Sequence, residues 1–249
     1  MSFKRDSASG LGWIRWSIGW LATPLVNRLF DRGKSLIHED RPEIAERRLR
    51  LARHLDPYSI PLIGQHAIAL SDCGDYESAE SAFRWMTEQS PEDPISWANL
   101  GESISRQRRY AEALAAFEKA ESLGMQGLSS GYYSIGAKML EDNRCQEAVP
   151  VYQHTVELDP DDGQAWTNLS FALINSNQAA SAEQAARRAV SLIPDDDLAW
   201  CNLGQALEAL GQFEEALSAY DKSVEVYPDH ILDCSHAADL RARLAQDNS

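Results

Sequence analysis

The chain has 249 residues, of which 44% are hydrophobic, and it carries a formal net charge of −15 at pH 7. This hydrophobic content is ordinary for a globular protein, and so acidic a chain argues against a general nucleic-acid binder, because phosphate contact needs Lys and Arg. The charge is uneven: residues 1–60 hold 11 Lys and Arg against 7 Asp and Glu, whereas the remainder holds 12 against 31.

The first predicted element is a helix within residues 10–30, which gathers three of the seven tryptophans. Trp13, Trp16 and Trp20 are three and four residues apart, so they share one side of this helix. The apolar run is interrupted and is too short for a comfortable transmembrane helix, which needs about 20 apolar residues. Pro24 is expected to kink or end it.

Ile14 and Ile18 form an apolar stripe beside the tryptophans. Trp favours the membrane interface, and nearby basic residues, here Arg28 and Arg32, favour anionic lipid. Segment 1–25 is therefore predicted to dock on a membrane surface or on a larger, membrane-bound partner. The other interpretation is a helix that caps the helical pair following it.

From residue 60 onward the sequence repeats itself about every 34 residues. Trp166 and Trp200 are 34 apart, and so are Pro194 and Pro228. Each period holds apolar residues at helical spacing, then a residue suited to a left-handed helix end, then a second helical run that usually stops at Pro. A fixed period of this length indicates a stack of helix–turn–helix hairpins.

The aromatic, Leu-Gly, Ala, aromatic and Pro positions of this period resemble the tetratricopeptide repeat. Five units between residues 60 and 230 carry the pattern: Ile60–Asp93, Pro94–Gly127, Ser129–Asp162, Gly163–Asp196 and Asp197–His230. The residues that close their first helices are Gly74, Arg108, Asn143, Asn177 and Gly211. The resemblance implies an all-α fold, a right-handed α-solenoid in which neighbouring repeats cover one another's apolar faces.

The segments around these units are less regular. Residues 26–59 lack the aromatic position and are interpreted as a divergent first repeat. Residues 231–249 are predicted to form a capping helix and tail, with Leu240 and Leu244 covering the last repeat. The run 124–128 has an extra residue and no Pro, which predicts a looser turn.

In this family the first helix of each repeat lines a concave groove, and the second residue after the aromatic position usually faces it. Here that position holds Gln65, Asn99, Ser134, Asn168 and Asn202. Amides of this kind pair with the backbone of an extended peptide, while Tyr133 and Phe171 suit apolar side chains. The alternatives are that the amides bond neighbouring turns of their own chain and that Tyr133 packs within its own repeat.

No catalytic residue, metal site or cofactor is expected. His230, Cys234 and His236 are close in sequence but lack further ligands, and no nucleophile or phosphate-loop motif is present. The four cysteines have no CxxC spacing, which is typical of free thiols in a reducing compartment. A cytoplasmic location, either free or peripheral at the cytoplasmic face of a membrane, is the resulting expectation.

Together these features predict a non-enzymatic scaffold, adaptor or assembly factor that binds a protein segment in the groove. The acidic body favours a partner with basic patches. Two alternatives remain open: a permanent structural subunit of a large membrane complex, and a regulatory subunit of a separate enzyme.

Overall fold

A computed structural model describes the backbone of residues 11–227 and 231–247, and side chains from residue 23 to 227 and from 236 to 246. All regular structure in these residues is helical, in thirteen helices. They are α1 (Leu11–His38), α2 (Pro42–Leu55), α3 (Ile60–Asp72), α4 (Tyr76–Gln89), α5 (Pro94–Ser105), α6 (Tyr110–Ser122), α7 (Ser129–Glu141), α8 (Cys145–Leu158), α9 (Gly163–Asn175), α10 (Ala179–Leu192), α11 (Asp197–Ala209), α12 (Phe213–Val226) and α13 (Ile231–Asp247).

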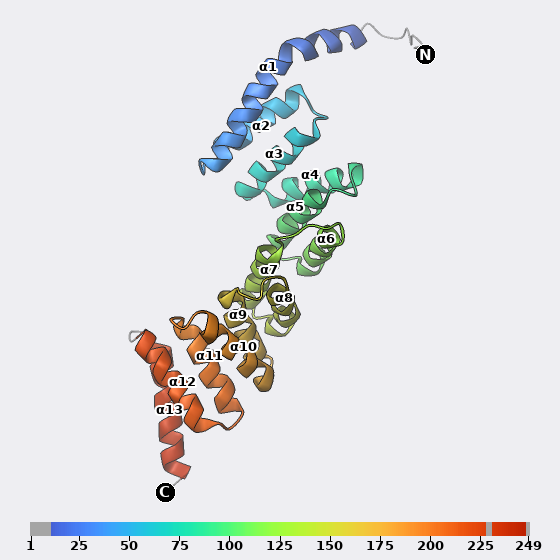
Figure 1. Ribbon diagram of the computed structural model, residues 1–249. Coiled ribbons are helices and arrows are strands. Elements are labelled where there is room, and N and C mark those ends of the chain that lie inside the picture. Colours follow the sequence, from blue (N-terminus) through green and yellow to red (C-terminus); the bar gives the residue numbers. More distant parts are fainter. Residues whose placement is uncertain (1–10, 228–230, 248–249) are drawn as a thin grey trace. The chain divides into compact units, whose positions relative to one another are not determined.

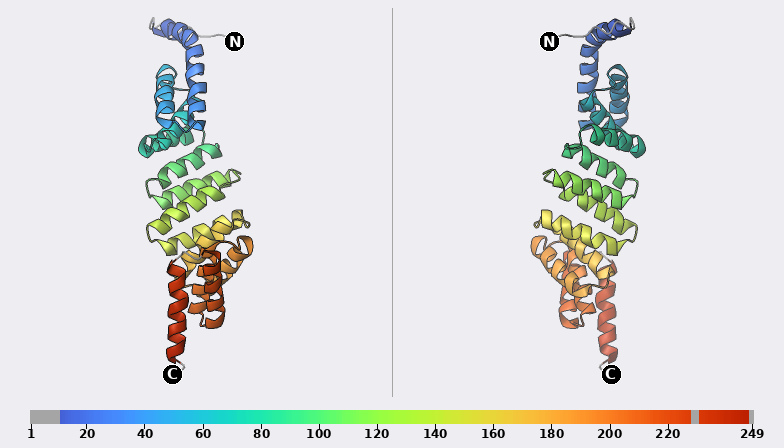
Figure 2. Two further views of the ribbon diagram at one scale, coloured as in Figure 1. Left: turned by 90° about the vertical axis from the view of Figure 1, so that its left-hand side faces the viewer. Right: turned by 90° about the vertical axis from the view of Figure 1, so that its right-hand side faces the viewer.

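The chain divides into two compact units, Met1–Met125 (unit 1) and Gln126–Ser249 (unit 2). The division falls in the turn that the sequence marks as irregular, where Gly124 and Gly127 both have positive φ. Within each unit the helices pack as consecutive antiparallel pairs (Figures 1 and 2). The fold is therefore the all-helical repeat array that the sequence predicts.

A residue with positive φ follows the first helix of each of the five predicted repeats. These residues are Gly74, Arg108, Asn143, Asn177 and Gly211, with φ between 58° and 84°. After α11 the chain then bonds back in a Schellman arrangement, with Gln212 N donating to Leu207 O at 2.9 Å. Asp40 lies 34 residues before Gly74 and also has positive φ, at 53°.

Small residues recur with the period of the repeat because the two helices of each pair pack closely at these positions. A Cβ added at Gly204 would lie 2.5 Å from the Tyr220 ring, so α11 and α12 meet at a distance that only Gly allows. Gly136 faces the Tyr152 ring in the same way. The matching Ala positions of the second helices are fully buried: Ala79, Ala113, Ala148, Ala182 and Ala216.

The Trp of the repeat fixes the turn that precedes it. Trp200 Nε1 donates to the carbonyl oxygen of Pro194 at 2.8 Å, and Trp97 and Trp166 make the same bond to the turn before them. This hydrogen bond satisfies both a half-buried indole and a turn carbonyl. The regular Trp-to-Pro spacing therefore has a direct structural cause.

The two ends of the chain depart from the repeat. α1 runs through Pro24 as one helix, so of the two outcomes expected at Pro24, a kink or an end, the end is wrong, and residues 11–25 share a helix with residues 26–38. At the other end, α13 packs on α12 with Ala237 and Leu240 buried. Leu244 packs against the same core, as the sequence predicts.

Candidate functional site

The first helices of successive pairs form the inner layer of each unit. In unit 1, α3 contacts both α1 and α5, and in unit 2, α9 contacts both α7 and α11, in addition to the contacts between chain neighbours. In a curved stack of hairpins, the helices that approach one another most closely lie on the concave side. The odd-numbered helices from α1 to α11 therefore carry the concave face of each unit.

Tyr133 on α7 and Asn168 and Phe171 on α9 form a mixed apolar and polar surface, here called the inner face of unit 2. Asn168 Nδ2 donates to the Tyr133 hydroxyl at 2.9 Å, which ties the two helices together. Phe171 follows one helical turn after Asn168 and is 41% exposed. The structure thus joins two of the predicted groove residues by a hydrogen bond and has the third one helical turn along α9.

Tyr152 supports this face from beneath. Its ring meets the Tyr133 ring edge to face, with centroids 5.8 Å apart, and its side chain is fully buried. Burial raises the pKa of Tyr152 above its ordinary value, so the phenol is neutral at neutral pH. The Tyr133 ring is therefore held between Asn168 and Tyr152 before any partner arrives.

Asn202 is placed differently from Asn168. It is only 5% exposed and donates to Thr167 O at 3.1 Å and to Ser170 Oγ at 3.0 Å, both on α9. Both amides bond the preceding repeat, as the second interpretation has it, and Asn202 differs from Asn168 in that it is buried. The repeat position that Asn168 and Asn202 share therefore lies between the concave face and the interface of successive repeats.

The other predicted groove residues lie on inner-layer helices and are half-buried. Ser134 on α7 accepts a bond from Lys138 Nζ at 3.2 Å. Gln65 on α3 and Asn99 on α5 belong to unit 1, so they are not part of the inner face of unit 2.

The predicted docking residues lie on α1. The side chains of Trp13, Ile14, Trp16, Ile18 and Trp20 are outside the described residues. Arg28 is exposed, and Arg32 pairs with Glu39 at 2.6 Å, which compensates its charge. Within the described part of the chain, none of the helices has the length and apolarity needed to cross a bilayer.

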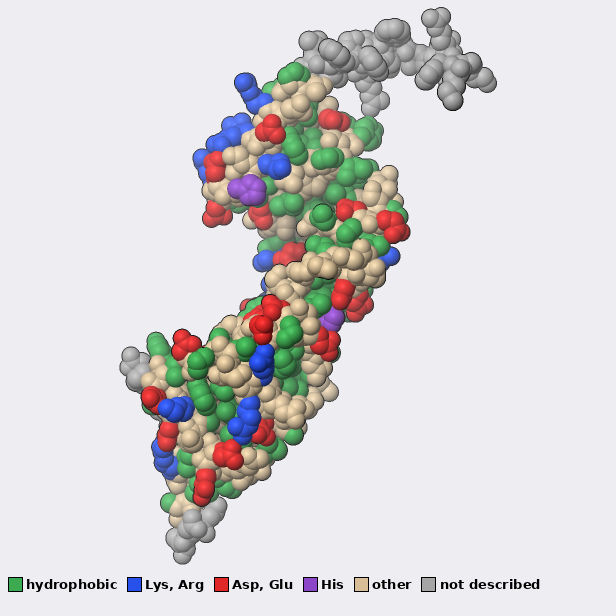
Figure 3. Space-filling model, in the orientation of Figure 1, with side chains coloured by type: hydrophobic (Ala, Val, Ile, Leu, Met, Phe, Trp, Pro, Cys, Tyr) green, Lys and Arg blue, Asp and Glu red, His purple; other side chains and the backbone are tan. Residues whose placement is uncertain are grey.

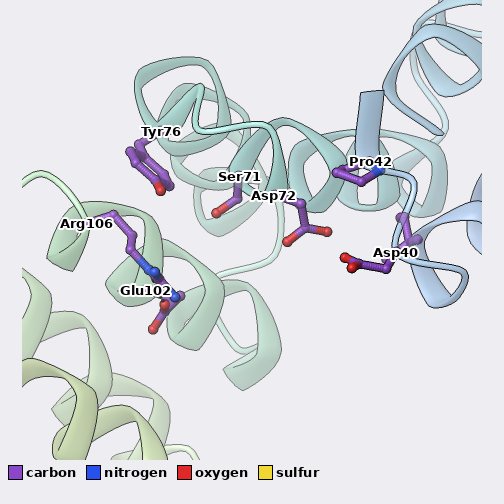
Figure 4. Close-up of a pocket in the computed structure, with 8 residues that line it drawn as sticks. Asp40, Pro42, Ser71, Asp72, Tyr76, Glu102 and Arg106 are labelled. Atoms are coloured by element: carbon purple, nitrogen blue, oxygen red, sulfur yellow. Dashed lines mark hydrogen bonds and ion pairs between the residues drawn. The ribbon is translucent and has the colours of Figure 1, made fainter. Parts of the chain in front are cut away.

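A pocket of about 300 Å³ lies in unit 1 (Figure 4). It is formed by the last turns of α1, α3 and α5, by the turn before α2 and by the start of α4. Its lining residues are Ile37, Asp40, Pro42, Ser71, Asp72, Tyr76, Glu102 and Arg106. Sequence reasoning missed it because these residues stand outside the aromatic-plus-two position of the repeat.

Two carboxylates of this pocket, Asp40 and Asp72, point toward one another (Figure 4). Burial raises the pKa of Asp72; the Asp40 charge adds to this effect and Arg106 opposes it. Arg106 is held elsewhere, since its Nε donates to Glu102 Oε1 at 2.8 Å. The pocket is therefore polar and acidic.

Metal ligands do not converge in the described part of the chain, where no group of three or more His, Cys, Asp or Glu is placed to hold an ion. Of the three residues noted as close in sequence, His230 and the side chain of Cys234 lie outside the described residues. The described cysteines, Cys73, Cys145 and Cys201, form no disulfide with one another.

Two solved structures share this arrangement of helices. YrrB, described as a TPR protein with an unusual peptide-binding site, aligns with a TM-score of 0.61 and 24% identity over 77% of this chain and 97% of its own. MamA aligns with a TM-score of 0.57 and 19% identity over 67% of this chain and 91% of its own. At these identities the likeness concerns the fold.

Two curated relatives match shorter segments. The protein O-mannosyl-transferase TMTC1 of Mus musculus is 29% identical over 106 residues, which are 41% of this chain and 11% of that protein. A TPR repeat-containing protein of Picosynechococcus sp. is 36% identical over 72 residues, 29% of this chain and 19% of that protein. The chain thus spans only a small part of either relative, and the transferase activity is not carried over.

Family profiles described as tetratricopeptide repeat match residues 65–127, 139–200 and 198–230. These segments make up more than half of the chain. Each coincides with helix pairs in which a residue of positive φ follows the first helix. The chain belongs to the tetratricopeptide repeat family.

Proposed function

We propose that the protein is a non-enzymatic interaction scaffold that holds an extended segment of a partner protein against the inner face of unit 2. The observation that carries the proposal is Phe171, which is 41% exposed on a concave-side helix, one turn after the Asn168 that anchors Tyr133. Aromatic side chains of this kind dominate binding energy at protein interfaces. YrrB, whose description names a peptide-binding site, shares the fold, and the proposal extends that class of function to this chain.

The polar part of the face supports backbone recognition. Asn168 uses its amide nitrogen to hold Tyr133, and its amide oxygen can accept a hydrogen bond from a peptide N–H. Because Tyr133 is already fixed by Asn168 and Tyr152, little side-chain freedom is lost when a segment binds. The acidic composition favours a partner segment with basic residues.

The domain organisation belongs to the same proposal. We assign residues 60–230 to five repeats, 231–249 to a cap, and 26–59 to a divergent first repeat. Two observations support the last assignment: Asp40 has positive φ at the repeat position of Gly74, and Gly33 approaches Leu49 as Gly204 approaches Tyr220. An adaptor or assembly factor working in the cytoplasm is the role that this organisation favours, ahead of a permanent subunit of a membrane complex or of a separate enzyme.

The test is to select binders for the full-length chain from a random-peptide library and to measure Kd for the best one. Phe171→Ala should weaken that peptide at least about 10-fold, as expected for an aromatic anchor. Gln184→Ala, an exposed position on α10, is the matched control and should leave the Kd unchanged. Equal binding by wild type and Phe171→Ala would refute the site.

The two asparagines sharpen this test. Asn168→Ala should weaken peptide binding, because the variant loses both the anchor of Tyr133 and a backbone contact. Asn202→Ala should instead lower the free energy of unfolding, since it leaves Ser170 Oγ and Thr167 O on α9 without their partner amide. If Asn202→Ala weakened peptide binding and Asn168→Ala only lowered the free energy of unfolding, the groove would run over α11 rather than α9.

A second candidate function, docking on an anionic membrane surface, concerns unit 1. Arg47, Arg48, Leu51 and Leu55 recur at helical spacing and are all exposed, with Leu51 50% and Leu55 38% exposed. Figure 3 shows Lys and Arg side chains gathered on this part of the molecule. Cationic side chains beside exposed leucines suit the interface of a bilayer that contains anionic lipids. Residues 1–30 would contact the same surface.

Cosedimentation of the full chain with phosphatidylserine vesicles tests this second function. Arg47→Glu with Arg48→Glu should weaken vesicle binding about 10-fold or more, because each cation near such a surface contributes about 1 kcal/mol. Lys119→Glu with Lys222→Glu makes the same charge change on α6 and α12 and serves as the control. Equal sedimentation with uncharged phosphatidylcholine vesicles, or none with either, would rule the function out.

A further inference from the structure

The hydroxyl group of Tyr152 has no hydrogen-bond partner in the described part of the chain. The side chain is fully buried, so the hydroxyl is also out of contact with bulk water. A buried polar group without a partner costs free energy, because it has given up its bonds to water, and such groups are rare in folded proteins. The packing of the free chain therefore leaves one donor beneath the inner face of unit 2 without a task.

Other repeats show that this position does not require a hydroxyl group. The residues at the same repeat position, four after the buried Ala of the second helix, are Phe83, Phe117, Ala186 and Tyr220. Tyr220 donates its hydroxyl to Glu208 Oε2 at 3.0 Å. Leu140 stands two 34-residue periods before Glu208, so the repeat of Tyr152 lacks this acceptor. A phenylalanine would fill the same space as Tyr152, and the hydroxyl is an addition to it.

The hydroxyl end of Tyr152 lies toward the inner face of unit 2. A Cβ added at Gly136 of α7 would lie 2.8 Å from Cζ, the ring carbon that carries the hydroxyl, so the tip of the ring reaches across from α8 to α7. There it meets the Tyr133 ring. Burial raises the pKa of Tyr152, and the nearby Asn168 opposes this rise, yet the pair is outside hydrogen-bond geometry in the free chain.

Two hydrogen-bonding groups beside this hydroxyl are also open. Asn168 uses Nδ2 to bond the Tyr133 hydroxyl at 2.9 Å, which leaves its amide oxygen with two lone pairs. Tyr133 accepts that bond with its oxygen, so its own hydrogen is left to donate. Neither the amide oxygen nor the Tyr133 hydrogen is bonded to another described residue.

We infer that these three side chains form a directed hydrogen-bond network when a segment binds. Tyr152 donates to the Asn168 oxygen, Asn168 donates to the Tyr133 hydroxyl, and Tyr133 donates to a backbone carbonyl oxygen of the bound segment. Successive bonds of this kind polarise and strengthen one another. Tyr133 is then the residue that touches the segment, and Tyr152 is a positioning residue beneath it. The network rests on the proposed scaffold function and specifies which group the inner face of unit 2 binds.

The charges around the network favour a neutral acceptor over a carboxylate. Burial is the main cause of the raised pKa of Tyr152, and the charges of Asp162 and Glu141 add to it, so the phenol stands in a negative field. That field repels a carboxylate, whereas a backbone carbonyl carries no net charge. The second lone pair of the Asn168 oxygen stays available for a peptide N–H.

Two Tyr-to-Phe variants test the unpaired hydroxyl without any ligand. Tyr152→Phe removes a group that has no partner, so it should leave the free energy of unfolding unchanged or raise it. Tyr220→Phe, at the same repeat position, is the matched control and should lower it, because the bond to Glu208 is lost. Urea unfolding measures both. An equal loss in the two variants would show that the Tyr152 hydroxyl is already bonded in the free chain and would overturn the network.

Peptide affinity tests the network in the bound state. With the library-selected peptide, Tyr133→Phe and Tyr152→Phe should each raise the Kd about 2- to 10-fold, the effect of one lost hydrogen bond. Both variants keep the aromatic ring, so the loss reports the hydroxyl group. Tyr220→Phe should leave the Kd unchanged although it lowers stability. A wild-type Kd in Tyr152→Phe would remove that residue from the network.

Replacing the peptide's backbone amides by esters, one at a time, identifies the acceptor, because an ester carbonyl accepts a weaker hydrogen bond. One ester should weaken binding to the wild type and have a smaller effect in Tyr133→Phe, since both changes act on the same bond. Additive effects at every position would overturn the assignment of a backbone carbonyl. Coupling of Tyr133 to a carboxylate of the peptide, measured by Glu→Gln or Asp→Asn exchange in the peptide, would overturn it as well.

The same titrations separate the network from the proposed function. A weakened Phe171→Ala together with wild-type Kd values in Tyr133→Phe and Tyr152→Phe would reject the network and keep the scaffold. Weakened binding in both tyrosine variants with an unaffected Phe171→Ala would keep the network and reject Phe171 as the anchor.

Discussion

His66 illustrates how a single buried side chain depends on pH. It is 6% exposed, and its Nδ1 lies 3.3 Å from Arg53 Nη1 while its Nε2 lies 3.3 Å from Glu46 Oε1. The guanidinium can only donate, so Nδ1 accepts and Nε2 carries the hydrogen, which makes the ring neutral. Burial lowers the pKa of His66 below its ordinary value of 6.5; Glu46 opposes this shift, and Arg53 and Arg50 add to it.

Stability should therefore fall in mild acid. A group with a lowered pKa in the folded state contributes fully above its unfolded pKa and loses that contribution as pH drops below about 6.5, by at most about 1.4 kcal/mol per pH unit. Urea unfolding at pH 7.5 and at pH 5.5 measures the loss. His66→Gln should reduce it, and the exposed His54→Gln should not. An unchanged loss in His66→Gln would contradict the account.

Substitution by alanine should have different effects on stability at two glycines of the first helices. A Cβ at Gly204 would lie 2.5 Å from the fully buried Tyr220 ring, whereas at Gly64 it would lie 3.2 Å from the flexible end of Met86. Alanine favours a helix over glycine by about 1 kcal/mol, so Gly64→Ala should stabilise or be neutral. Gly204→Ala should cost about 1–3 kcal/mol by overpacking. Equal changes in the free energy of unfolding would argue against the close helix contact.

At the scale of the helix, the residue before α11 does more than cap it. The Asp196 carboxylate accepts a hydrogen bond from Leu198 N at 3.2 Å. It also accepts one from Thr167 Oγ1, on α9, at 2.9 Å, so it joins two repeats. Asp75 caps α4 with a single bond from Ser78 N. Asp196→Ala should therefore lower the free energy of unfolding by about 1 kcal/mol more than Asp75→Ala. Chemical denaturation of both variants measures the difference, and equal losses would show that the bond between repeats contributes nothing.

The helix pairs were the most predictable feature, because each repeat position serves one structural purpose, such as close helix packing or the end of a helix. The positive φ at Gly74, Asn143 and Asn177 follows from residue type, but Arg108 adopts it as well, so position within the repeat overrides residue preference there. The hydrogen-bond partner of a side-chain amide was less predictable. Asn168 and Asn202 share a repeat position, yet the first bonds Tyr133 and the second bonds α9, since the outcome depends on which side chain the neighbouring repeat supplies.

The acidic pocket lay beyond prediction for a related reason. Its residues come from three successive helix pairs, and no single repeat contains enough of them to form a pattern. Asp40 stands 34 residues before Gly74, but its positive φ became apparent only in the structure.

For the whole molecule, the turn at residues 124–128 divides the repeats into two units with different surfaces. Unit 1 carries the acidic pocket and the exposed arginines and leucines of α2, while unit 2 carries the inner face around Phe171. The proposed functions therefore assign different ligands to different units. A scaffold of this kind acts through pre-formed helices, so binding should protect particular elements rather than reorganise the fold.

Hydrogen–deuterium exchange of the full chain, with and without a library-selected peptide, tests the central claim most directly. Because the peptide is proposed to lie on the inner face of unit 2, exchange should slow in α7 and α9 and stay unchanged in α8 and α10. Slowed exchange confined to α8 and α10, or protection that persists fully in Phe171→Ala, would contradict the scaffold proposed here.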